Sequence, residues 1–382
     1  MSNIAKYPEP NCKRLLSEFL RLIQIDSTSY NEAAIASQLS ADLKAIGCTV
    51  YDDQSTAITG SDSGNLIATL PATPGQAGKL YFSAHMDSVQ PGQGIKYQIE
   101  DGVIRSQGQT ILAGDDKVGI AAALEMLRTL VESGLPHPEI VILLSVAEED
   151  GLIGARAMDG EALGFAGEPC FVLDADGTPG GVIIGAPFHY EFSARFIGQA
   201  AHAGVSPESG ISAIKMAAQA VAALPNGRLD EMTTINVGQI QGGSANNVVP
   251  DLCLVTGEMR CLESDRLDQL KEQVTNIIEE SAQAAGGQVQ LEFDKTFHGF
   301  KLSVDDPLVQ LVLSTAKELG LPAQTFYTGG GSDANIFAGK GLNPVVLATG
   351  MTAVHSKAES LAIADMENLT RLVIALALSY QP

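Results

Sequence analysis

The sequence predicts an α/β protein with a mixed central sheet and a second, inserted α+β unit. Strand-like and helix-like segments alternate in the first half of the chain, a run of alternating strands follows in the middle, and another strand and helix come near the end. At 382 residues the chain is long for one core, which favours two domains or one large domain with an insertion.

The first half alternates strands and helices. The strand-like segments between residues 65 and 175 are NLIATL, KLYFSAH, EIVILLSVA and CFVLDAD. A helix is expected from about Lys117 to Val131, with one buried apolar stripe formed by Ile120, Leu124, Leu127 and Val131. PVVLATG (344–350) and the helical tail after it continue the pattern. Such alternation is typical of a sheet with helices on both faces.

The middle of the chain has a different pattern of predicted strands and helices. The strand-like segments HYEFSARFIG, TTINVGQIQGG, LCLVTGEMR and QVQLEFDKTF are interleaved with a small-residue helix (208–223) and an acidic helix (263–283). Four strands and two helices in this order predict a βαββαβ unit with an antiparallel sheet. We therefore expect a discontinuous first domain, residues 1–186 and 299–382, into which residues 187–298 are inserted.

Composition excludes several classes of function. The chain has 45 acidic and 23 basic residues, a formal charge of −22 that repels nucleic-acid phosphates and anionic membranes, so neither is expected as a partner. Apolar runs such as IVILL are too short to span a bilayer, and MSNIAKYPEP lacks the apolar segment of a signal peptide. The five cysteines are scattered, which argues against a disulfide framework or a thiolate zinc site. We expect a soluble cytoplasmic protein.

Polar side chains gather where the predicted strands end. His85 and Asp87 are two residues apart at the end of an apolar strand, so they can point to the same face. Further acids follow other strands or open the predicted helix, namely Asp115, Asp116, Glu148, Glu149, Asp150, Asp174 and Asp176. In open α/β sheets, ligands bind beyond the carboxyl ends of the strands, so these side chains are expected to meet in one crevice.

Each motif also has a purely structural interpretation. An H-x-D pair is common as a satisfied surface pair. Asp115 and Asp116 ahead of a helix can serve as capping and dipole compensation, and an acidic turn after a strand is commonly solvated. The occurrence of all three motifs at successive strand ends favours a shared site.

A metal centre would resolve the repulsion among these carboxylates. Four or five acids in a partly dry cleft would have to stay partly protonated unless cations neutralised them. Two zinc ions and a shared hydroxide would be balanced by three carboxylates and two neutral imidazoles, namely Asp115, Glu149, Asp174, His85 and His355. His85 offers a nitrogen ligand, and Asp87 can accept its other ring N–H, which fixes the tautomer.

As an ordered set, the motifs resemble those of the M20 metallopeptidase family, in particular its peptidase T-like (tripeptidase) branch. The resemblance covers nearly the whole chain and is highly specific. The motifs are SAHMDSV (83–89), ILAGDDKVGIAA (111–122), SVAEEDGLIGA (145–155), FVLDADG (171–177), AHAGVSPESGISAI (201–214), GGSANNVVPD (242–251) and GMTAVHSKAE (350–359). The resemblance implies a zinc-exopeptidase-like catalytic domain and an inserted ferredoxin-like lid domain.

The resemblance also implies a dinuclear metal centre. It assigns one metal to His85 and Asp174 and the other to Glu149 and His355, with Asp115 bridging both. The segment LDADG offers two aspartates for one ligand position. Asp174 is chosen because it directly follows the apolar strand, and Asp176 is the alternative. Zinc is the expected metal, and cobalt or manganese are alternatives because the same ligand types accept them.

The resemblance assigns catalytic roles as well. Two nearby metals would lower the pKa of a shared water and polarise the scissile carbonyl. Glu148, which binds no metal, would act as general base and pass the proton to the leaving amine. Asp87 would assist catalysis by orienting His85. A cis peptide bond between Asp115 and Asp116 is also implied.

Three residues of the inserted segment match substrate-binding positions of the family. His202 matches a lid histidine that stabilises the developing oxyanion, although it could also be a turn residue. Arg260 matches a position that grips the substrate carboxylate, and Asn247 is a weaker contact candidate. TGGGSDAN (328–335) is expected to be a tight loop that lets the backbone approach a peptide. The resemblance leaves open whether His202 acts in its own site or in that of a second copy, through a homodimer of lid domains.

The expected function is a dinuclear metal-dependent exopeptidase that removes N-terminal residues from short peptides such as tripeptides. Aspartate as the third carboxylate, where the carboxypeptidase and aminoacylase branches tend to have glutamate, favours the aminopeptidase-like branch. An amidohydrolase of N-acyl amino acids is the alternative within the family. A non-catalytic metal-dependent binding protein is the alternative outside it, and the presence of Glu148 argues against that alternative.

Overall fold

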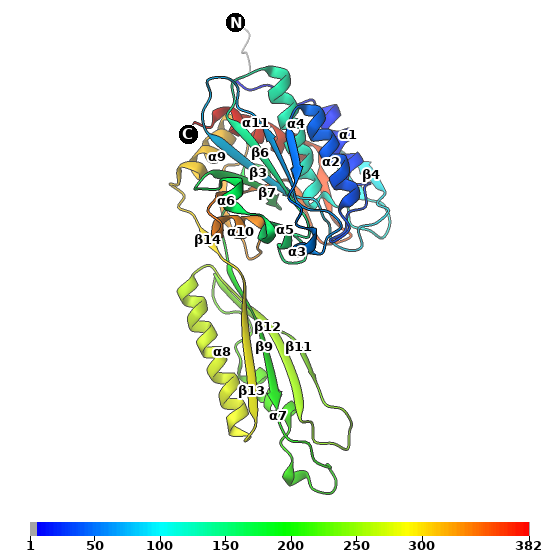
Figure 1. Cartoon of the computed structure of the whole chain (residues 1–382), viewed down its shortest axis with the longest axis vertical. Helices are drawn as coiled ribbons and strands as arrows, with labels where there is room; N and C mark the ends of the chain where they lie inside the picture. The colour runs from blue at the N-terminus through cyan, green and yellow to red at the C-terminus, as the bar shows by residue number, and fades with distance from the viewer. Residues whose placement is uncertain (1–5, 382) are drawn as a thin grey trace. The chain divides into compact units, whose positions relative to one another are not determined.

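The structure is a computed structural model and describes residues 6–381. Contacts between residues divide the chain into two compact units (Figure 1). The first unit comprises the chain up to Ile184, Leu302–Tyr327 and the chain from Ser332; the second comprises Gly185–Lys301 and Thr328–Gly331. The glycine-rich Thr328–Gly331 segment thus belongs to the second unit, although it lies outside the range expected for the insertion.

A mixed sheet forms the centre of the first unit, which confirms the predicted α/β class. Its strands follow the order β1-β2-β6-β3-β7-β16-β8. They are β1 (Thr49–Asp52), β2 (Leu66–Leu70), β3 (Lys79–His85), β6 (Glu139–Ser145), β7 (Pro169–Ala175), β8 (Gly181–Ala186) and β16 (Asn343–Ala348). β6, β3, β7 and β16 are parallel to one another, and β2 and β8 flank them in antiparallel orientation. The four parallel strands therefore end at the same edge.

Shorter strands extend this framework. β15 (Gln324–Tyr327) also pairs with β8, and β14 (Phe300–Lys301) pairs with its last two residues within the second unit. A separate four-stranded sheet has the order β17-β18-β5-β4. Its strands are β4 (Tyr97–Glu100), β5 (Val103–Ser106), β17 (Met351–Thr352) and β18 (Ser360–Ala362).

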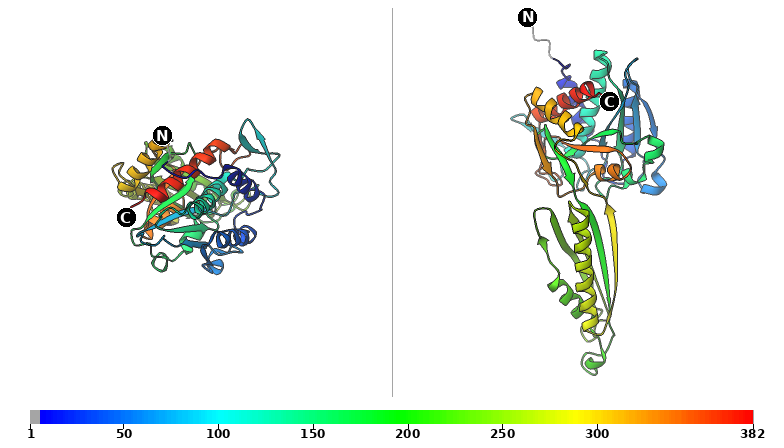
Figure 2. Two further views of the ribbon diagram at one scale, coloured as in Figure 1. Left: turned by 90° about the horizontal axis from the view of Figure 1, so that it is seen from above. Right: turned by 90° about the vertical axis from the view of Figure 1, so that its left-hand side faces the viewer.

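Helices cover both faces of the central sheet (Figure 1, Figure 2). The helices of the first unit are α1 (Cys12–Leu22), α2 (Ala33–Ile46), α3 (Thr56–Thr59), α4 (Gly114–Ser133), α5 (Ile153–Ala157), α6 (Gly160–Leu163), α9 (Pro307–Glu318), α10 (Asp333–Gly339) and α11 (Ile363–Ser379). Local sequence sets their ends. α9, for example, begins with Pro307 while the Asp306 side chain accepts a hydrogen bond from the Leu308 N–H at 2.8 Å.

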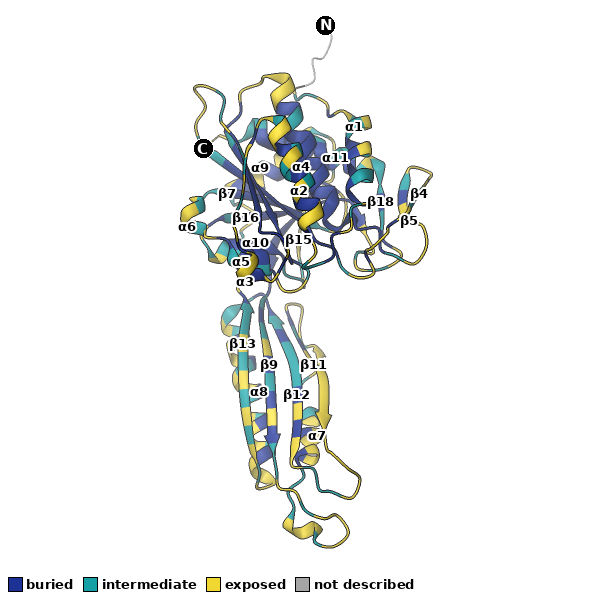
Figure 3. Ribbon diagram, turned by 45° about the vertical axis from the view of Figure 1, so that its right-hand side comes forward, coloured by how far each residue is buried: buried dark blue, intermediate teal, exposed yellow. Residues whose placement is uncertain are grey.

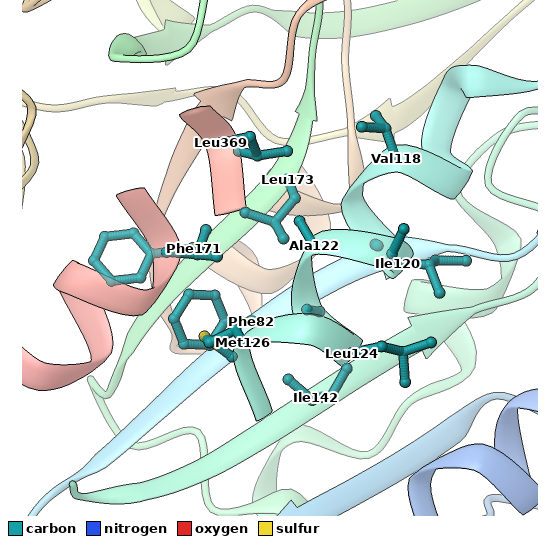
Figure 4. Packing of buried hydrophobic residues seen from close by; sticks show 14 of the residues in the cluster. Phe82, Val118, Ile120, Ala122, Leu124, Met126, Ile142, Phe171, Leu173 and Leu369 are labelled. Atoms are coloured by element: carbon teal, nitrogen blue, oxygen red, sulfur yellow. The ribbon is translucent and has the colours of Figure 1, made fainter. Parts of the chain in front are cut away.

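The central strands are apolar on both faces because both faces are covered. On one face, Phe82 and Leu173 pack against Ala122 and Met126 of α4 (Figure 4). On the other face, Tyr81 makes an edge-to-face contact with Phe165 at 5.5 Å between ring centroids, and Phe165 makes another with Phe337 of α10 at 5.8 Å. Burial on both faces fixes the strands that carry the candidate site.

The second unit is an antiparallel sheet with two helices. Its strands are β9 (Phe188–Ile197), β10 (Gly227–Arg228), β11 (Thr233–Gly242), β12 (Leu252–Cys261) and β13 (Gln288–Phe297), in the order β10-β11-β12-β9-β13. α7 (Ala213–Ala223) and α8 (Ser264–Ala284) contribute to its apolar core, and a short 3₁₀ turn spans Pro207–Ser209. The burial colours of Figure 3 show exposed residues recurring along these strands, unlike the buried central strands of the first unit.

None of the helices within residues 6–381 has both the length and the apolar composition that crossing a bilayer requires.

One expectation about α4 is wrong. Ile120, Leu124 and Leu127 are buried as predicted, but Val131 is 47% exposed. Val131 lies in the last turn of α4, where it lines a surface pocket together with Arg128 and other residues. The preceding residue, Leu130, is fully buried, so the buried face at the end of α4 runs through Leu127 and Leu130 instead of Val131.

Leu127 and Val131 provide a matched pair for testing the core. Leu127→Ala removes a fully buried side chain and should lower the free energy of unfolding by about 2–5 kcal/mol. Val131→Ala, in the same helix, should change the free energy of unfolding by about 0.5 kcal/mol or less. Urea denaturation followed by far-UV circular dichroism measures both changes. Equal losses for the two variants would contradict this description of the core.

Candidate metal centre

Neighbouring parallel strands carry most of the predicted site residues to one edge of the sheet. His85 is the last residue of β3, and Asp174 is the penultimate residue of β7. Glu148 and Glu149 follow the end of β6, and His355 lies in the loop after β17, the short strand that comes next after β16. The carboxyl ends of adjacent parallel strands are where ligands bind in open α/β sheets.

Asp115 lies between two imidazoles. Its Oδ1 is 3.1 Å from His85 Nε2, and its Oδ2 is 3.2 Å from His355 Nε2. His85 Nε2 is also 3.9 Å from Asp174 Oδ1, and His355 Nε2 is 2.9 Å from Glu149 Oε2. The structure therefore brings together all five side chains that the sequence singled out as metal ligands.

The backbone at the start of α4 is irregular. The peptide bond between Asp115 and Asp116 is cis, as the resemblance implied. Asp116 Oδ2 accepts a hydrogen bond from the His85 main-chain N–H at 3.3 Å, and Oδ1 accepts one from the Gly119 N–H at 3.2 Å. Asp116 thereby ties the start of α4 to the end of β3. Its carboxylate also falls in a potential ligand group with His85 and Asp174, in which the ligand atoms lie within 4.8 Å of one another.

The acids of this cluster carry perturbed pKa values. Burial raises the pKa of Asp174 well above its usual range, and the nearby charge of Asp115 adds to this effect. Burial likewise raises the pKa of Glu148 and Glu149. Hydrogen bonds to Asp115 and Glu149 raise the pKa of His355 to about 10. Protons therefore stabilise the cluster by neutralising its charge, and divalent cations would do the same.

The donor set fits divalent metal ions. Glu149 Oε1 is buried and has no hydrogen-bond partner among residues 6–381, so it is available as a ligand atom. His85 Nδ1 lies 3.3 Å from Asp87 Oδ1 and 3.1 Å from the Asp87 main-chain oxygen. A proton on Nδ1 is satisfied there, which directs the Nε2 lone pair toward the cluster. Imidazole and carboxylate ligands suit zinc, cobalt and manganese.

Asp87 also organises the turn that carries the two glutamates. Its Oδ1 accepts a hydrogen bond from the Glu148 N–H at 3.0 Å, and its Oδ2 accepts hydrogen bonds from the Glu149 N–H at 3.2 Å and from Ser29 Oγ at 2.7 Å. Burial alone would raise the pKa of Asp87, but His85 beside it lowers the pKa. Asp87 therefore connects His85 to the glutamate turn, a link that the sequence did not reveal.

Two more buried side chains hold this turn and were not identified from the sequence. Asn65 Oδ1 accepts a hydrogen bond from the Val146 N–H at 3.1 Å, and Glu32 Oε1 accepts one from the Ala147 N–H at 2.9 Å. Asp87 accepts the next two N–H groups, so each main-chain N–H of residues 146–149 donates to a side-chain oxygen. Asn65 and Glu32 look like ordinary turn and cap residues in the sequence, which gives no signal for these long-range contacts.

Asp333 is another buried acid near the site. It is the first residue of α10, in the segment TGGGSDAN, and its Oδ2 accepts a hydrogen bond from Ser145 Oγ. Its Oδ1 is buried and has no partner in the described part of the chain, and burial raises the pKa of Asp333 to about 6. The sequence suggested a tight loop here but assigned no role to this aspartate.

The three substrate-binding candidates of the second unit lie in two separate places. His202 and Asn247 are neighbours, because the Asn247 main-chain oxygen accepts a hydrogen bond from the Ala203 N–H at 2.9 Å. Both precede the first residue of β12, Leu252, whereas Arg260 is near the other end of β12. At about 3.3 Å per residue, the eight steps from Leu252 to Arg260 span roughly 26 Å.

Each of these candidates has a defined polar environment. His202 is exposed, and its Nδ1 accepts a hydrogen bond from the Gly204 N–H at 3.1 Å. The neutral ring then carries its proton on Nε2 as a free donor. Arg260 donates from Nη2 to Glu258 at 3.0 Å and from Nη1 to the Gly329 oxygen at 3.1 Å. Its Nε is buried without a partner among residues 6–381.

Imidazoles and carboxylates, all largely buried except the half-exposed His355, form a metal-binding arrangement at the carboxyl edge of a mixed α/β sheet, as metal-dependent hydrolases require. Residues 81–379 match the model of Peptidase family M20/M25/M40, and the chain belongs to this family. It is therefore a metallopeptidase, and its substrates are peptides.

Relatives at substantial identity cover nearly the whole chain. The chain is 38% identical to the aminopeptidase PepT of Bacillus cereus ATCC 10987, with a TM-score of 0.90 over 97% of this chain and 98% of that one. It is 35% identical to a tripeptidase of Staphylococcus aureus, with a TM-score of 0.92 over 97% and 99% of the two chains. It is also 39% identical to the uncharacterized protein YqjE of Bacillus subtilis, over 96% and 98% of the two sequences.

The choice between Asp174 and Asp176 as ligand can be tested by metal content. Asp174 Oδ1 is close to His85 Nε2, whereas Asp176 is exposed. Asp174→Asn should therefore lower the bound zinc by about one equivalent after dialysis, and Asp176→Asn should retain the wild-type amount. Elemental analysis by plasma mass spectrometry measures both. Loss of zinc in Asp176→Asn but not in Asp174→Asn would show that Asp176 is the ligand.

Proposed function

We propose that this metallopeptidase is a dinuclear exopeptidase that removes N-terminal residues from short peptides such as tripeptides. The observation that carries the proposal is the position of Asp115 between His85 and His355, in a cluster whose Asp174 and His85 act electrostatically on the buried Glu148. Likeness over the whole chain to an aminopeptidase and to a tripeptidase supports the substrate class.

The metal ligands in this proposal are the five clustered side chains. His85 and Asp174 would hold one ion, Glu149 and His355 the other, and Asp115 both. Zinc is the proposed metal, and cobalt or manganese fit the same ligands. Two divalent ions bound there would lower the pKa of a shared water and polarise the scissile carbonyl.

Glu148 is the proposed general base. Its side chain is buried, and burial together with the charge of Asp174 raises its pKa. A carboxylate with a raised pKa accepts a proton more readily near neutral pH. The bond from its main-chain N–H to Asp87 fixes the position of the turn. Glu148 would take the proton from the attacking water and then donate it to the leaving amine.

Substrate binding is proposed for Arg260, His202 and Asn247. The Arg260 guanidinium would bind the C-terminal carboxylate of the peptide, and the free Nε2–H of His202 would donate to the developing oxyanion. His202 pairs with Val248, just before β12 begins at Leu252, and β12 runs roughly 26 Å from Leu252 to Arg260. On this basis His202 and Arg260 of one chain would not both reach one tripeptide. If both residues serve the same peptide, His202 must come from a second copy of the chain, as in a homodimer.

Hydrolysis of a panel of unmodified tripeptides tests the proposed activity. The zinc-loaded wild type should release the N-terminal residue, and chelation should abolish the release. Glu148→Gln should lower kcat by about a hundredfold or more while both metals stay bound, since proton transfer is lost. Asp150→Asn, which changes an exposed acid two residues away, is the control and should keep most of the activity.

The same panel separates the alternatives. Cleavage of N-acetylated amino acids in preference to free-amine peptides would favour an amidohydrolase. Binding of peptides without turnover by the metal-loaded wild type would favour a binding protein. Either result would contradict the exopeptidase proposal.

The origin of His202 can be tested by complementation. His202→Ala and Glu148→Gln chains should each be inactive alone. Co-expression should restore about a quarter of the wild-type activity if His202 acts on a second copy, because half of the sites in the mixed dimers would be intact. Activity that stays at the level of the separate variants would show that His202 acts within its own chain.

A further inference from the structure

Glu359 is a buried acid with no assigned role. It lies four residues after His355, directly before β18, and its residue is 1% exposed. β18 pairs with β5, and the Glu359 N–H donates to the Ser356 oxygen at 3.1 Å, so the segment is anchored on both sides of the glutamate. A buried carboxylate needs compensating partners.

Those partners come from the loop that carries Asp115. Glu359 Oε2 accepts hydrogen bonds from the Leu112 N–H at 2.8 Å and the Ala113 N–H at 3.0 Å. Its Oε1 accepts a hydrogen bond from the Asp115 N–H at 3.1 Å. A Cβ atom on the intervening Gly114 would lie 3.1 Å from Oε1, so the loop wraps closely around the carboxylate. One side chain thus binds three main-chain donors of a four-residue loop.

The loop needs such an anchor because of its conformation. Ala113 has a φ of 56°, in the left-handed region that residues with a Cβ rarely adopt. Conformations of this kind persist only where the surroundings hold them in place. The three hydrogen bonds to Glu359 supply that restraint directly before Asp115.

We propose that Glu359 is a positioning residue for the metal centre. Through its two oxygens it locks the loop of Asp115 to the segment of His355, so that the two side chains keep their 3.2 Å separation. Among residues 6–381 its carboxylate hydrogen-bonds to main-chain N–H groups and to neither imidazole. This inference rests on the proposed role of Asp115 as the ligand shared by both metals.

Glutamine at this position makes a sharp test. Its amide keeps one accepting oxygen and replaces the other with an NH₂ group. If the amide oxygen takes the Oε2 position, the bonds from Leu112 and Ala113 remain, and the NH₂ group faces the Asp115 N–H. Two donors then oppose each other directly beside Asp115, and the opposite orientation breaks the other two bonds.

The first experiment compares Glu359→Gln with Glu125→Gln. Glu125 is also buried and accepts a hydrogen bond from a main-chain N–H, that of Asn11 at 2.8 Å, but it lies on the part of α4 away from the site. Glu359→Gln should lose zinc to a competing chelator about 10–100-fold more readily than wild type, and its kcat should fall while KM stays within about threefold. Glu125→Gln should keep wild-type zinc retention and kcat, whatever its melting temperature.

Hydrogen exchange in the metal-free wild type keeps the proposal testable even if the variant folds poorly. The amides of Leu112, Ala113 and Asp115 should exchange more slowly than those of the exposed neighbours Gly108 and Gln109. Exchange at equal rates would overturn the proposal. Zinc retention and kcat of Glu359→Gln equal to those of wild type would overturn it as well.

These outcomes are distinct from failure of the proposed function. A wild type that cleaves no peptide, while Glu359→Gln still loses zinc and protection at Asp115, would refute the exopeptidase proposal and support the positioning role. A wild type that cleaves tripeptides, with Glu359→Gln indistinguishable from it in every readout, would refute only the positioning role.

Discussion

Mutual repulsion among buried carboxylates is the constraint on which the site depends. Asp115, Glu148, Glu149 and Asp174 converge beyond the parallel strands, and burial raises the pKa of the last three. At Asp115 burial acts in the same direction, but hydrogen bonds from His355 and His85 outweigh it and lower the pKa. Such an arrangement is costly unless protons or cations neutralise it. Two imidazoles complete a donor set that suits divalent metals, and the partnerless oxygen of Glu149 agrees with this. Divalent metal ions would therefore both neutralise the buried carboxylates and bind to the ligand atoms that the cluster offers.

The buried strands and the loops that follow them hold these carboxylates and imidazoles in place. Strands buried on both faces end at one edge, and the polar groups that follow them are held by side chains rather than by regular secondary structure. Asp87, Asn65 and Glu32 receive the N–H groups of the glutamate turn, and Glu359 receives those of the Asp115 loop. Rigid support of this kind is what a metal site with several ligands requires.

The sequence predicted the parts of the molecule that depend on local pattern. Apolar alternation predicted the strands, and the polar residues at their ends predicted a shared crevice. The resemblance to the family supplied the assignment of ligands to the two metals, including His355. The supporting contacts of Glu32 and Glu359 join residues more than a hundred positions apart, and nothing in their local sequence distinguishes them from cap or turn residues. Periodicity also placed Val131 in the core, whereas the structure buries the adjacent Leu130, because spacing alone does not distinguish two neighbouring apolar residues. The separation of His202 from Arg260 could not be predicted, because it depends on where β12 begins and ends in the structure.

Anomalous diffraction from crystals grown with zinc tests the central claim most directly. Data collected on both sides of the zinc absorption edge should show two peaks in the first unit, with Asp115 between them, one next to His85 and Asp174 and the other next to His355 and Glu149. A single peak, or peaks remote from Asp115, would contradict the account of a carboxylate cluster neutralised by two metals.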